Sequence, residues 1–143
     1  MNLQNVMTTD PACATPATPL VDVARMMLAN DCGLLPVVDD LEHRQLLGVI
    51  SDRDIVVRAI AQSRNPLTLT TEALMTAPAL WVEEDTDLAD CCELMETNRI
   101  RRLPVRDAQG RVCGIVSLAD LARHENQAAL VGEVVREVST PAR

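Results

Sequence analysis

Apolar residues recur with helical spacing in two segments of the chain. At positions i, i+3, i+4 and i+7 these segments carry Leu20, Val23, Ala24 and Met27, and Leu88, Cys91, Cys92 and Met95. Such spacing places four side chains on one face of an α-helix. Thr18, which is followed by Pro19, and Thr86 precede the two stripes as expected helix N-caps. The pattern therefore predicts two amphipathic helices whose Cys and Met residues belong to a core.

Two short apolar runs follow each predicted helix and are typical of β-strands. They cover residues 34–38 and 46–50, and then 103–105 and 112–116. The first run of each pair contains a proline, which cannot donate to a strand ladder, so we expect an edge strand or an interrupted ladder. The second run is nearly all apolar, as expected of a strand buried on both faces. With the segments around them, both halves are predicted to follow the order strand, helix, strand, strand, helix.

The two halves also match residue by residue. The aligned segments are Val6-Met7-Thr8 with Leu74-Met75-Thr76, Leu35-Pro36-Val37 with Leu103-Pro104-Val105, and Gly48-Val49-Ile50-Ser51 with Gly114-Ile115-Val116-Ser117. Each copy is too short to bury a core alone, so we expect the copies to pack on each other and to carry function where they meet. The predicted segments are repeat 1 over 1–62, a linker over 63–73, repeat 2 over 74–126, and an amphipathic helix and tail over 127–143 with Leu130, Val134 and Val138 on one face.

Composition limits the classes of function. The 143 residues make one compact domain, well below the roughly 250 residues of a TIM-barrel enzyme. A net charge of −8 repels a nucleic-acid backbone, so we expect no nucleic-acid partner. No apolar run approaches the roughly 18 residues that cross a bilayer, and residues 1–10 lack the features of a signal peptide. We therefore expect a cytoplasmic protein without a membrane partner.

The five cysteines favour a reduced, structural role. Their number is odd, no CxxC pair is present, and four of them lie in apolar segments, which is typical of small buried hydrophobic residues. A metal site formed by cysteine with His43 or His124 stays open as an alternative, although neither histidine has a neighbouring ligand at zinc-site spacing. No glycine-rich phosphate loop and no Ser/His/acid set is present in the sequence, so we expect no enzymatic activity.

The residues best suited to chemistry form two SxxD motifs. Ser51 to Asp54 and Ser117 to Asp120 each follow a glycine-led strand. A serine N-cap with an acid three residues later is a capping box, which needs no ligand. A helix start at this place also offers free N–H groups and a positive dipole end to phosphate. The serine hydroxyl can donate to that phosphate, and the aspartate can accept from two ribose hydroxyls. The motifs therefore suit a nucleotide, and capping alone is the alternative.

The doubled pattern resembles a known family. MTxxP, a capped helix, LPV followed by Asp, and GhhSxxD are similar to the tandem cystathionine-β-synthase (CBS) domain, or Bateman module, over Val6 to Arg123. In length and in the extra C-terminal helix the chain resembles small stand-alone bacterial CBS-pair proteins of the hypoxic-response type. The resemblance implies an α/β fold of two βαββα repeats packed face to face with pseudo-twofold symmetry, and modules that dimerise. It also implies a non-enzymatic regulator that binds an adenosine ligand such as AMP, ATP, NAD(H) or S-adenosylmethionine.

The resemblance assigns residues to two clefts. Asp54 and Asp120 correspond to the position that holds the ribose hydroxyls, and Ser51 and Ser117 to the position near the phosphate. The remaining cleft positions are Cys32, Gly33 and Leu34, Ile100, Arg101 and Arg102, and the first-strand residues Thr8, Cys13, Thr76 and Trp81. Trp81 as an adenine-stacking ring and Trp81 as a core or interface residue are both open. Further candidate phosphate contacts are Arg53, Arg99, Arg101 and Arg102, for which solvated positions are the alternative.

The family pattern further implies that each cleft combines both repeats. The two expected sets are Cys32, Gly33 and Asp120, and Ile100, Arg101 and Asp54. Gly33 corresponds to the large, charged Arg101, and Asp52 corresponds to Leu118. Since these differences lie beside the expected ligand positions, the two sites are not equivalent.

Three interpretations remain open from the sequence. The first is a homodimeric sensor or regulator that binds an adenosine nucleotide between its repeats. A ligand-free dimerisation module, in which SxxD serves only as a capping box, is the second. The third is a metal- or redox-responsive variant that uses the cysteines. The sequence names neither the nucleotide nor a protein target.

Overall fold

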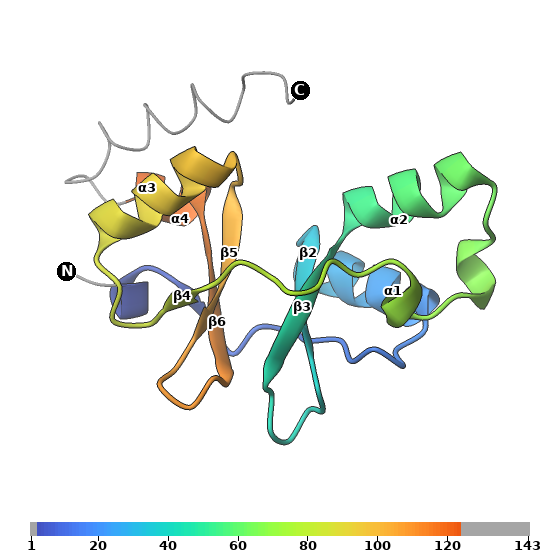
Figure 1. The fold of residues 1–143 in the computed structure, drawn as a ribbon, viewed down its shortest axis with the longest axis horizontal. Helices are drawn as coiled ribbons and strands as arrows, with labels where there is room; N and C mark the ends of the chain where they lie inside the picture. Colours follow the sequence, from blue (N-terminus) through green and yellow to red (C-terminus); the bar gives the residue numbers. More distant parts are fainter. Residues whose placement is uncertain (1–2, 124–143) are drawn as a thin grey trace. The chain divides into compact units, whose positions relative to one another are not determined.

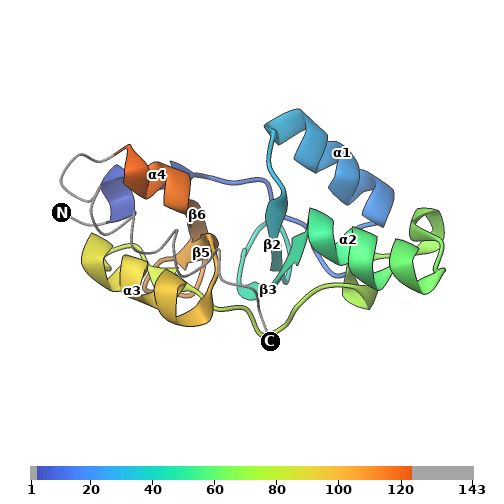
Figure 2. The same ribbon diagram turned by 90° about the horizontal axis from the view of Figure 1, so that it is seen from above.

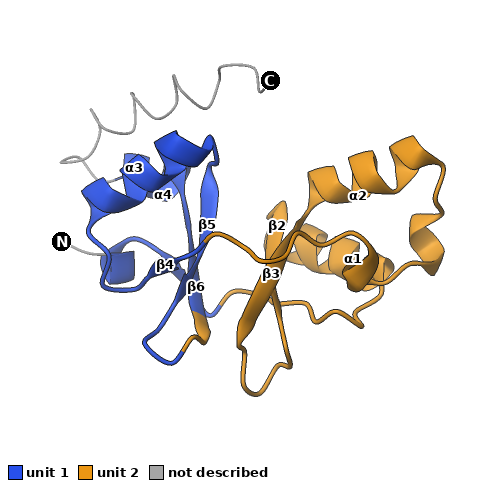
Figure 3. Ribbon diagram, viewed as in Figure 1, with its two compact units in different colours: residues 1–10, 81–109, 113–143 blue, residues 11–80, 110–112 orange. Residues whose placement is uncertain are grey.

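The computed structural model describes residues 3–123, along which helices and short strands alternate (Figures 1 and 2). These residues form two compact units that interleave the two sequence repeats (Figure 3). Of the described residues, unit 1 contains 3–10, 81–109 and 113–123, while unit 2 contains 11–80 and 110–112. Each unit therefore includes the first strand region of the other repeat.

Unit 2 is built on an antiparallel hairpin. Its elements are α1 (Leu20–Asn30), β2 (Leu34–Val38), β3 (Leu46–Ser51), α2 (Asp52–Arg58) and the 3-10 turns η2 (Ile60–Gln62), η3 (Pro66–Thr68) and η4 (Thr71–Ala73). Leu35 pairs with Ile50 across the hairpin. Thr76 extends the pairing by exchanging hydrogen bonds of 2.9 and 3.0 Å with Val49. Helices α1 and α2 contact each other within this unit (Figure 2).

Unit 1 contains a four-stranded sheet. Its elements are η1 (Leu3–Asn5), β1 (Thr8–Thr9), β4 (Val82–Glu83), α3 (Leu88–Asn98), β5 (Arg102–Arg106), β6 (Val112–Ser117) and α4 (Leu118–Ala122). The strand order is β1-β6-β5-β4, with β1 antiparallel to β6 and β4 parallel to β5. The expected order of strand, helix, strand, strand, helix is thus confirmed in both halves.

Helix starts differ from the prediction. Helix α1 begins at Leu20 with Pro19 in the N-cap position and no side-chain cap, and α3 begins after Asp87, also without one. The Thr18 hydroxyl instead accepts a 2.9 Å hydrogen bond from Thr15 N–H. Thr18 and Thr86 are therefore not the N-caps, because Thr18 stabilises the turn ahead of α1 and the first helical residue comes later than predicted.

The strand prolines interrupt ladders. Pro104 lies in β5, which is internal to its sheet, so the edge-strand alternative is wrong there. Strand β4 pairs with β5 only at Val105 and Arg106, after the proline. In unit 2, Ala14 N–H donates to the Pro36 carbonyl and the Ala14 carbonyl accepts from Val38 N–H. In both strands, therefore, the hydrogen bonds to the neighbouring segment continue after the proline, which has no N–H to donate.

Each unit has its own apolar core. The core of unit 1 includes all four predicted helix residues, Leu88, Cys91, Cys92 and Met95, and the core of unit 2 includes Leu20, Val23 and Met27. Ala24, however, is exposed, so the apolar stripe of α1 is narrower than predicted. Strand β3 alternates, with Ile50 fully buried and Leu47 40% exposed, and is not buried on both faces.

Two further predictions concern the chain as a whole. Within residues 3–123 we find no helix long and apolar enough to span a bilayer. The predicted apolar face of Leu130, Val134 and Val138 lies outside the described residues.

Gly48 in β3 marks a close approach of two backbone segments. A Cβ at this position would collide with the Thr76 carbonyl oxygen, which the ladder with Val49 holds in place. We expect Gly48→Ala to lower the free energy of unfolding by about 2 to 3 kcal/mol, at the upper part of the range for overpacked sites. Urea denaturation measures this loss.

The matched variant is Gly114→Ala in β6. Its added Cβ would meet the Met7 thioether first, and a flexible methionine can move. Gly114→Ala should therefore cost less stability than Gly48→Ala. Equal losses for the two variants would contradict this account of the close approach.

Candidate functional site

Both SxxD motifs form complete capping boxes. In α2, Asp54 N–H donates to Ser51 Oγ at 3.1 Å, and Ser51 N–H donates to Asp54 Oδ2 at 2.9 Å. In α4 the same two hydrogen bonds, between Ser117 and Asp120, are 3.0 and 2.8 Å long. The capping geometry is thus real in both repeats. A capping box still leaves the second carboxylate oxygen, Oδ1, available to another group.

An arginine approaches this second oxygen in each motif. Arg123 Nη2 donates to Asp120 Oδ1 at 2.8 Å, and the Asp120 side chain is 7% exposed. Arg58 Nε lies 3.6 Å from Asp54 Oδ1, and the Asp54 side chain is 14% exposed. Asp120 therefore has both oxygens in short hydrogen bonds, whereas Asp54 has only a longer ion pair at Oδ1.

The first helical N–H groups are largely used. Asp52 N–H donates to the Gly33 carbonyl at 2.9 Å, Arg53 N–H to Asp52 Oδ1 at 2.8 Å, and Asp54 N–H to Ser51 Oγ. The expectation of free backbone donors for phosphate is therefore wrong at α2. Asp52 adds a further negative charge at this helix start.

The start of α4 is similar in shape and different in charge. Leu118 N–H donates to the Arg101 carbonyl at 2.8 Å, as Asp52 does to Gly33 in the other unit. Leu118 brings no carboxylate, so the start of α4 carries one negative charge fewer. The two motifs therefore differ in charge, as predicted.

Several predicted site residues lie together within one unit. Unit 2 brings Gly33 next to Ser51 and Asp54, and unit 1 brings Arg101 next to Ser117 and Asp120. Thr76 pairs with Val49 in unit 2, and Thr8 pairs with Ile115 in unit 1. The predicted sets that join Cys32 and Gly33 to Asp120, and Ile100 and Arg101 to Asp54, stay predictions.

Other predicted residues take different roles. Cys13 is buried, and its Sγ accepts a 3.2 Å hydrogen bond from Arg44 Nη2. Arg99 is the left-handed C-cap of α3. The partly buried residues of the predicted set are Cys32, Leu34 and Ile100, and the exposed ones are Arg53, Arg101 and Arg102.

Trp81 stacks on an arginine that the sequence did not single out. The Arg106 guanidinium carbon lies 3.2 Å from the centroid of the indole ring. Arg106 ends β5, whereas α4 is hydrogen-bonded to Arg101, the residue just before β5. Within unit 1, Trp81 therefore lies at the opposite end of the strand from Ser117 and Asp120. This contact depends on the pairing of β4 with β5, which no spacing in the sequence reveals.

The cysteines are free thiols. Burial raises the pKa of Cys91 to about 12 and also raises that of the neighbouring Cys92. Burial together with the nearby Glu84 carboxylate raises the pKa of Cys113 to about 12. These thiols stay protonated at neutral pH, which opposes reactivity and metal binding.

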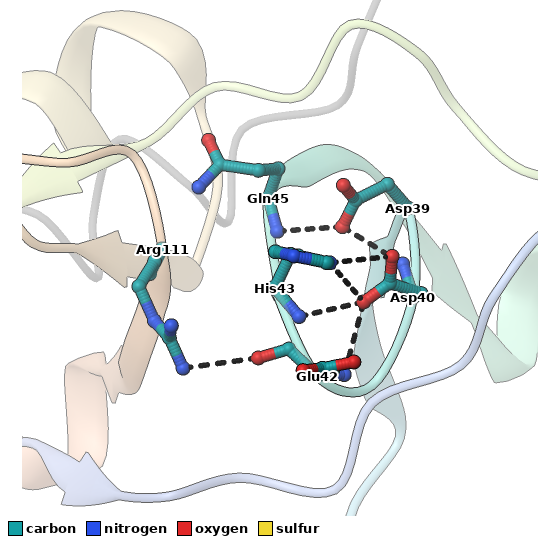
Figure 4. A network of polar contacts seen from close by, with 6 residues as sticks. All are labelled: Asp39, Asp40, Glu42, His43, Gln45 and Arg111. Carbon is teal, nitrogen blue, oxygen red and sulfur yellow. Dashed lines mark hydrogen bonds and ion pairs between the residues drawn. The ribbon is translucent and has the colours of Figure 1, made fainter.

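A histidine and two carboxylates meet in the turn between β2 and β3 (Figure 4). One ligand atom of each of Asp39, Asp40 and His43 lies within 4.8 Å of the others. His43 Nδ1 lies 2.9 Å from Asp40 Oδ2. The expectation that His43 has no neighbouring ligand is therefore wrong, since Asp39 and Asp40 lie four and three residues before it in the sequence.

The same carboxylates also hold the turn together. Asp40 Oδ1 accepts from the N–H groups of Glu42 and His43, and Asp39 Oδ1 accepts from those of Asp40 and Gln45. Two hydrogen bonds from His43 lower the pKa of Asp40, and the one from the His43 backbone N–H has the larger effect. The Asp40 hydrogen bond raises the pKa of His43 in turn. Protons therefore compete with any metal for this histidine.

Comparison with known proteins identifies related sequences. The family model described as CBS domain matches residues 3–61 and 71–126. Hypoxic response protein 1 of Mycobacterium tuberculosis is 30% identical over 96% of this chain and 94% of its own length. CBS domain-containing protein YhcV of Bacillus subtilis is 33% identical over 96% and 95%. The chain also spans 58% of the length of an uncharacterized protein of Methanopyrus kandleri, at 31% identity over 81% of this chain.

Solved structures similar to this chain include CBS-pair proteins as well. Hypoxic Response Protein I with two coordinated zinc ions has a TM-score of 0.78 and 31% identity, covering 87% of this chain and 98% of its own. CBSX2 in complex with AMP has a TM-score of 0.74 and 28% identity over 90% and 98%. The CBS domain pair of protein MJ0100, in complex with 5-methylthioadenosine and S-adenosyl-L-methionine, has a TM-score of 0.77 and 27% identity over 90% and 98%.

The two capping boxes differ enough to predict a difference in stability. Asp120 is more buried and makes two short charge-assisted hydrogen bonds. We expect Asp120→Ala to lower the free energy of unfolding by about 2 to 3 kcal/mol. Asp54→Ala should cost about 1 kcal/mol, as for an ordinary cap. Urea denaturation gives both values, and a larger loss for Asp54→Ala would contradict the ranking.

Proposed function

Since this chain belongs to the CBS domain family, we propose that it is a non-enzymatic regulatory module that binds an adenosine nucleotide and acts as a homodimer. The ligand class is that of AMP, ATP, NAD(H) and S-adenosylmethionine. Ligand binding would alter the relative geometry of the two repeats and so signal to a protein target.

One observation carries the proposal. In each unit a nearly buried aspartate lies one turn into a helix whose first N–H is hydrogen-bonded to the loop ahead of a β-hairpin. That loop offers backbone edges to a base, and the carboxylate offers acceptors to ribose hydroxyls. The arrangement occurs twice, in Gly33 with Asp54 and in Arg101 with Asp120.

Relatives support the ligand class. CBSX2 forms a complex with AMP, and the CBS pair of MJ0100 forms one with 5-methylthioadenosine and S-adenosyl-L-methionine. These three ligands share an adenosine moiety and differ in what the 5′ position carries. A ribose-binding aspartate would serve all of them, so it supports the adenosine class and leaves the 5′ group open.

The two sites should differ in their preference for phosphate. Asp52 adds negative charge at the start of α2, and its carboxylate already accepts from Arg53 N–H. At the start of α4 the equivalent residue is Leu118, and Arg101 adds a guanidinium nearby. We therefore expect ligands with more phosphate groups to prefer the residues around Ser117.

Metal binding is a second candidate function. Asp39, Asp40 and His43 supply two carboxylates and an imidazole within 4.8 Å, a donor set that suits zinc. A structural relative holds two coordinated zinc ions. Because the carboxylates already accept backbone hydrogen bonds, we rank this function second.

An apolar surface on unit 2 supports the dimer. The exposed fractions of Leu28 in α1, Val56 in α2 and Ile60 in η2 are 85%, 54% and 58%. Aliphatic groups so exposed on adjoining helices favour burial against a second copy. Asp22, Arg25 and Arg53 are exposed on the same two helices and would contribute to a polar rim.

A thermal-shift panel tests the ligand class. AMP, ATP, NADH, S-adenosylmethionine and zinc are added one at a time. A ligand at about 100 times its dissociation constant stabilises by about 2.7 kcal/mol, so the bound class should raise the melting temperature. A shift with zinc alone would favour the metal-responsive function, and no shift with any of them would favour the ligand-free module.

Single substitutions then test the ribose role. Asp54→Ala and Asp120→Ala should each weaken nucleotide binding at one site by about 1.5 to 3 kcal/mol, or about one to two decades. Calorimetry gives the affinities, and circular dichroism confirms that the variants are folded. Asp87→Ala, the same charge change at the uncapped start of α3, is the control. Unchanged affinity in both site variants would leave SxxD as a capping box only.

Light scattering tests the dimer. The unmodified chain should have twice the chain mass, and Val56→Lys with Ile60→Lys should raise the dimer dissociation constant at least about tenfold, or about 1.4 kcal/mol. Leu41→Lys, at an exposed leucine in the β2–β3 turn, should leave the mass unchanged. A single-chain mass of the unmodified protein across micromolar concentrations would rule the homodimer out.

A further inference from the structure

The stacked pair of Arg106 and Trp81 is held by the backbone of unit 1. Strands β4 and β5 run parallel, with Glu83 aligned with Arg106. Glu84 N–H donates to the Arg106 carbonyl at 3.1 Å. The guanidinium carbon lies 3.2 Å from the indole centroid, within the range of a strong cation–π contact. Strand register and stacking together fix the plane of the guanidinium.

The Nε atom of this guanidinium is the part that matters for binding. Its Nε is buried and has no hydrogen-bond partner within residues 3–123. Glu83 is aligned with Arg106 and Glu84 follows it, yet within residues 3–123 neither carboxylate forms an ion pair with Arg106. A buried donor without an acceptor is costly, and native structures seldom keep one without a reason. An acceptor from outside the chain would remove that cost.

We propose that Arg106 and Trp81 form a binding site for an oxyanion, either a phosphate or a carboxylate group. Nε–H and one Nη–H of an arginine form a fork that matches two oxygens of such a group. The indole ring holds this fork in one orientation before the ligand arrives, which lowers the entropic cost of binding. The guanidinium charge attracts the anion, and salt screens this attraction, so binding should weaken as the salt concentration rises.

The site is separate from the SxxD motif of the same unit. Helix α4 is hydrogen-bonded to Arg101, and Arg106 is five residues further along. At roughly 3.3 Å per strand residue this distance is about 16 Å. An anion at Arg106 and a ribose at Asp120 therefore contact different residues. The inference goes beyond the proposed function and stands or fails independently of it.

Trp81 itself is the probe. It is the only tryptophan, and the chain has no tyrosine, so intrinsic fluorescence reports on this ring alone. Inorganic phosphate, acetate and chloride are titrated at matched ionic strength. We expect a saturable change in emission with phosphate or acetate, and the stronger of the two identifies the ligand class. A response no larger than that of chloride would overturn the proposal.

Variants at Arg106 complete the test. Arg106→Gln removes the charge and the fork, and Arg106→Lys keeps the charge while losing the fork, so each should weaken anion binding at least about tenfold. Arg25→Gln, the same charge change at an exposed position of α1, should titrate like the unmodified chain. If Arg106→Gln does not fold, Arg106→Lys decides. Unchanged titrations in the folded Arg106 variants would overturn the proposal.

Adenosine binding separates this proposal from the function proposed above. Adenosine carries no phosphate or carboxylate, so its affinity, measured by calorimetry, should be equal for Arg106→Lys and the unmodified chain. Loss of phosphate binding with adenosine binding retained supports the oxyanion site. A loss of both in Arg106→Lys would contradict a separate site. A phosphate response without any adenosine binding would contradict only the nucleotide function.

Discussion

The hydrogen bond from the first residue of α2 to the Gly33 carbonyl, and its counterpart from α4 to Arg101, fix the geometry of both candidate sites. Each bond is under 3 Å long and ties a helix start to the loop ahead of a β-hairpin. With the helix start fixed, the serine and aspartate close a capping box and the carboxylate stays largely buried. The proposed ligand binding and the local stability of the helix would therefore depend on the same few atoms.

This constraint explains how two similar repeats become unequal sites. The backbone arrangement is the same in both, so differences come from the side chains around it. Asp120 is held by Arg123 at 2.8 Å, whereas Arg58 stays 3.6 Å from Asp54. A ribose bound as proposed would have to share or displace the Arg123 hydrogen bond at Asp120, and would meet a weaker competitor, Arg58, at Asp54. Asp54 is thus the more accessible acceptor, while the α4 start has the more favourable charge.

Much of the fold follows from periodicity. Residues 88, 91, 92 and 95 all lie in the core as the helical spacing predicted, and strand β2 has the predicted bounds. The helix caps were missed because a threonine hydroxyl can stabilise the preceding turn as well as a helix start, as Thr18 does. The exchange of first strand regions between repeats was missed for a different reason. Because the two repeats have the same hydrophobic pattern, the pattern does not determine whether a first strand pairs within its own repeat or with the other repeat.

For the candidate sites too, local features could be predicted from the sequence and contacts between distant segments could not. SxxD was predictable because its four residues are contiguous and interact locally, and the structure contains both of its predicted capping boxes. Contacts between distant segments were not predictable. Arg106 reaches Trp81 only through the register of two parallel strands. Local motifs carry their geometry in the sequence, while tertiary pairs acquire it on folding.

Calorimetric comparison of AMP with 2′,3′-dideoxy-AMP tests the central claim most directly. The two ligands have the same base and phosphate, and they differ only in the hydroxyls that Asp54 and Asp120 would accept from. Losing hydrogen bonds to a charged acceptor costs about 1.5 to 3 kcal/mol, so the account predicts that the dideoxy ligand binds about one to two decades more weakly. Equal affinities would show that the aspartates only cap their helices and that the nucleotide, if bound, is held elsewhere.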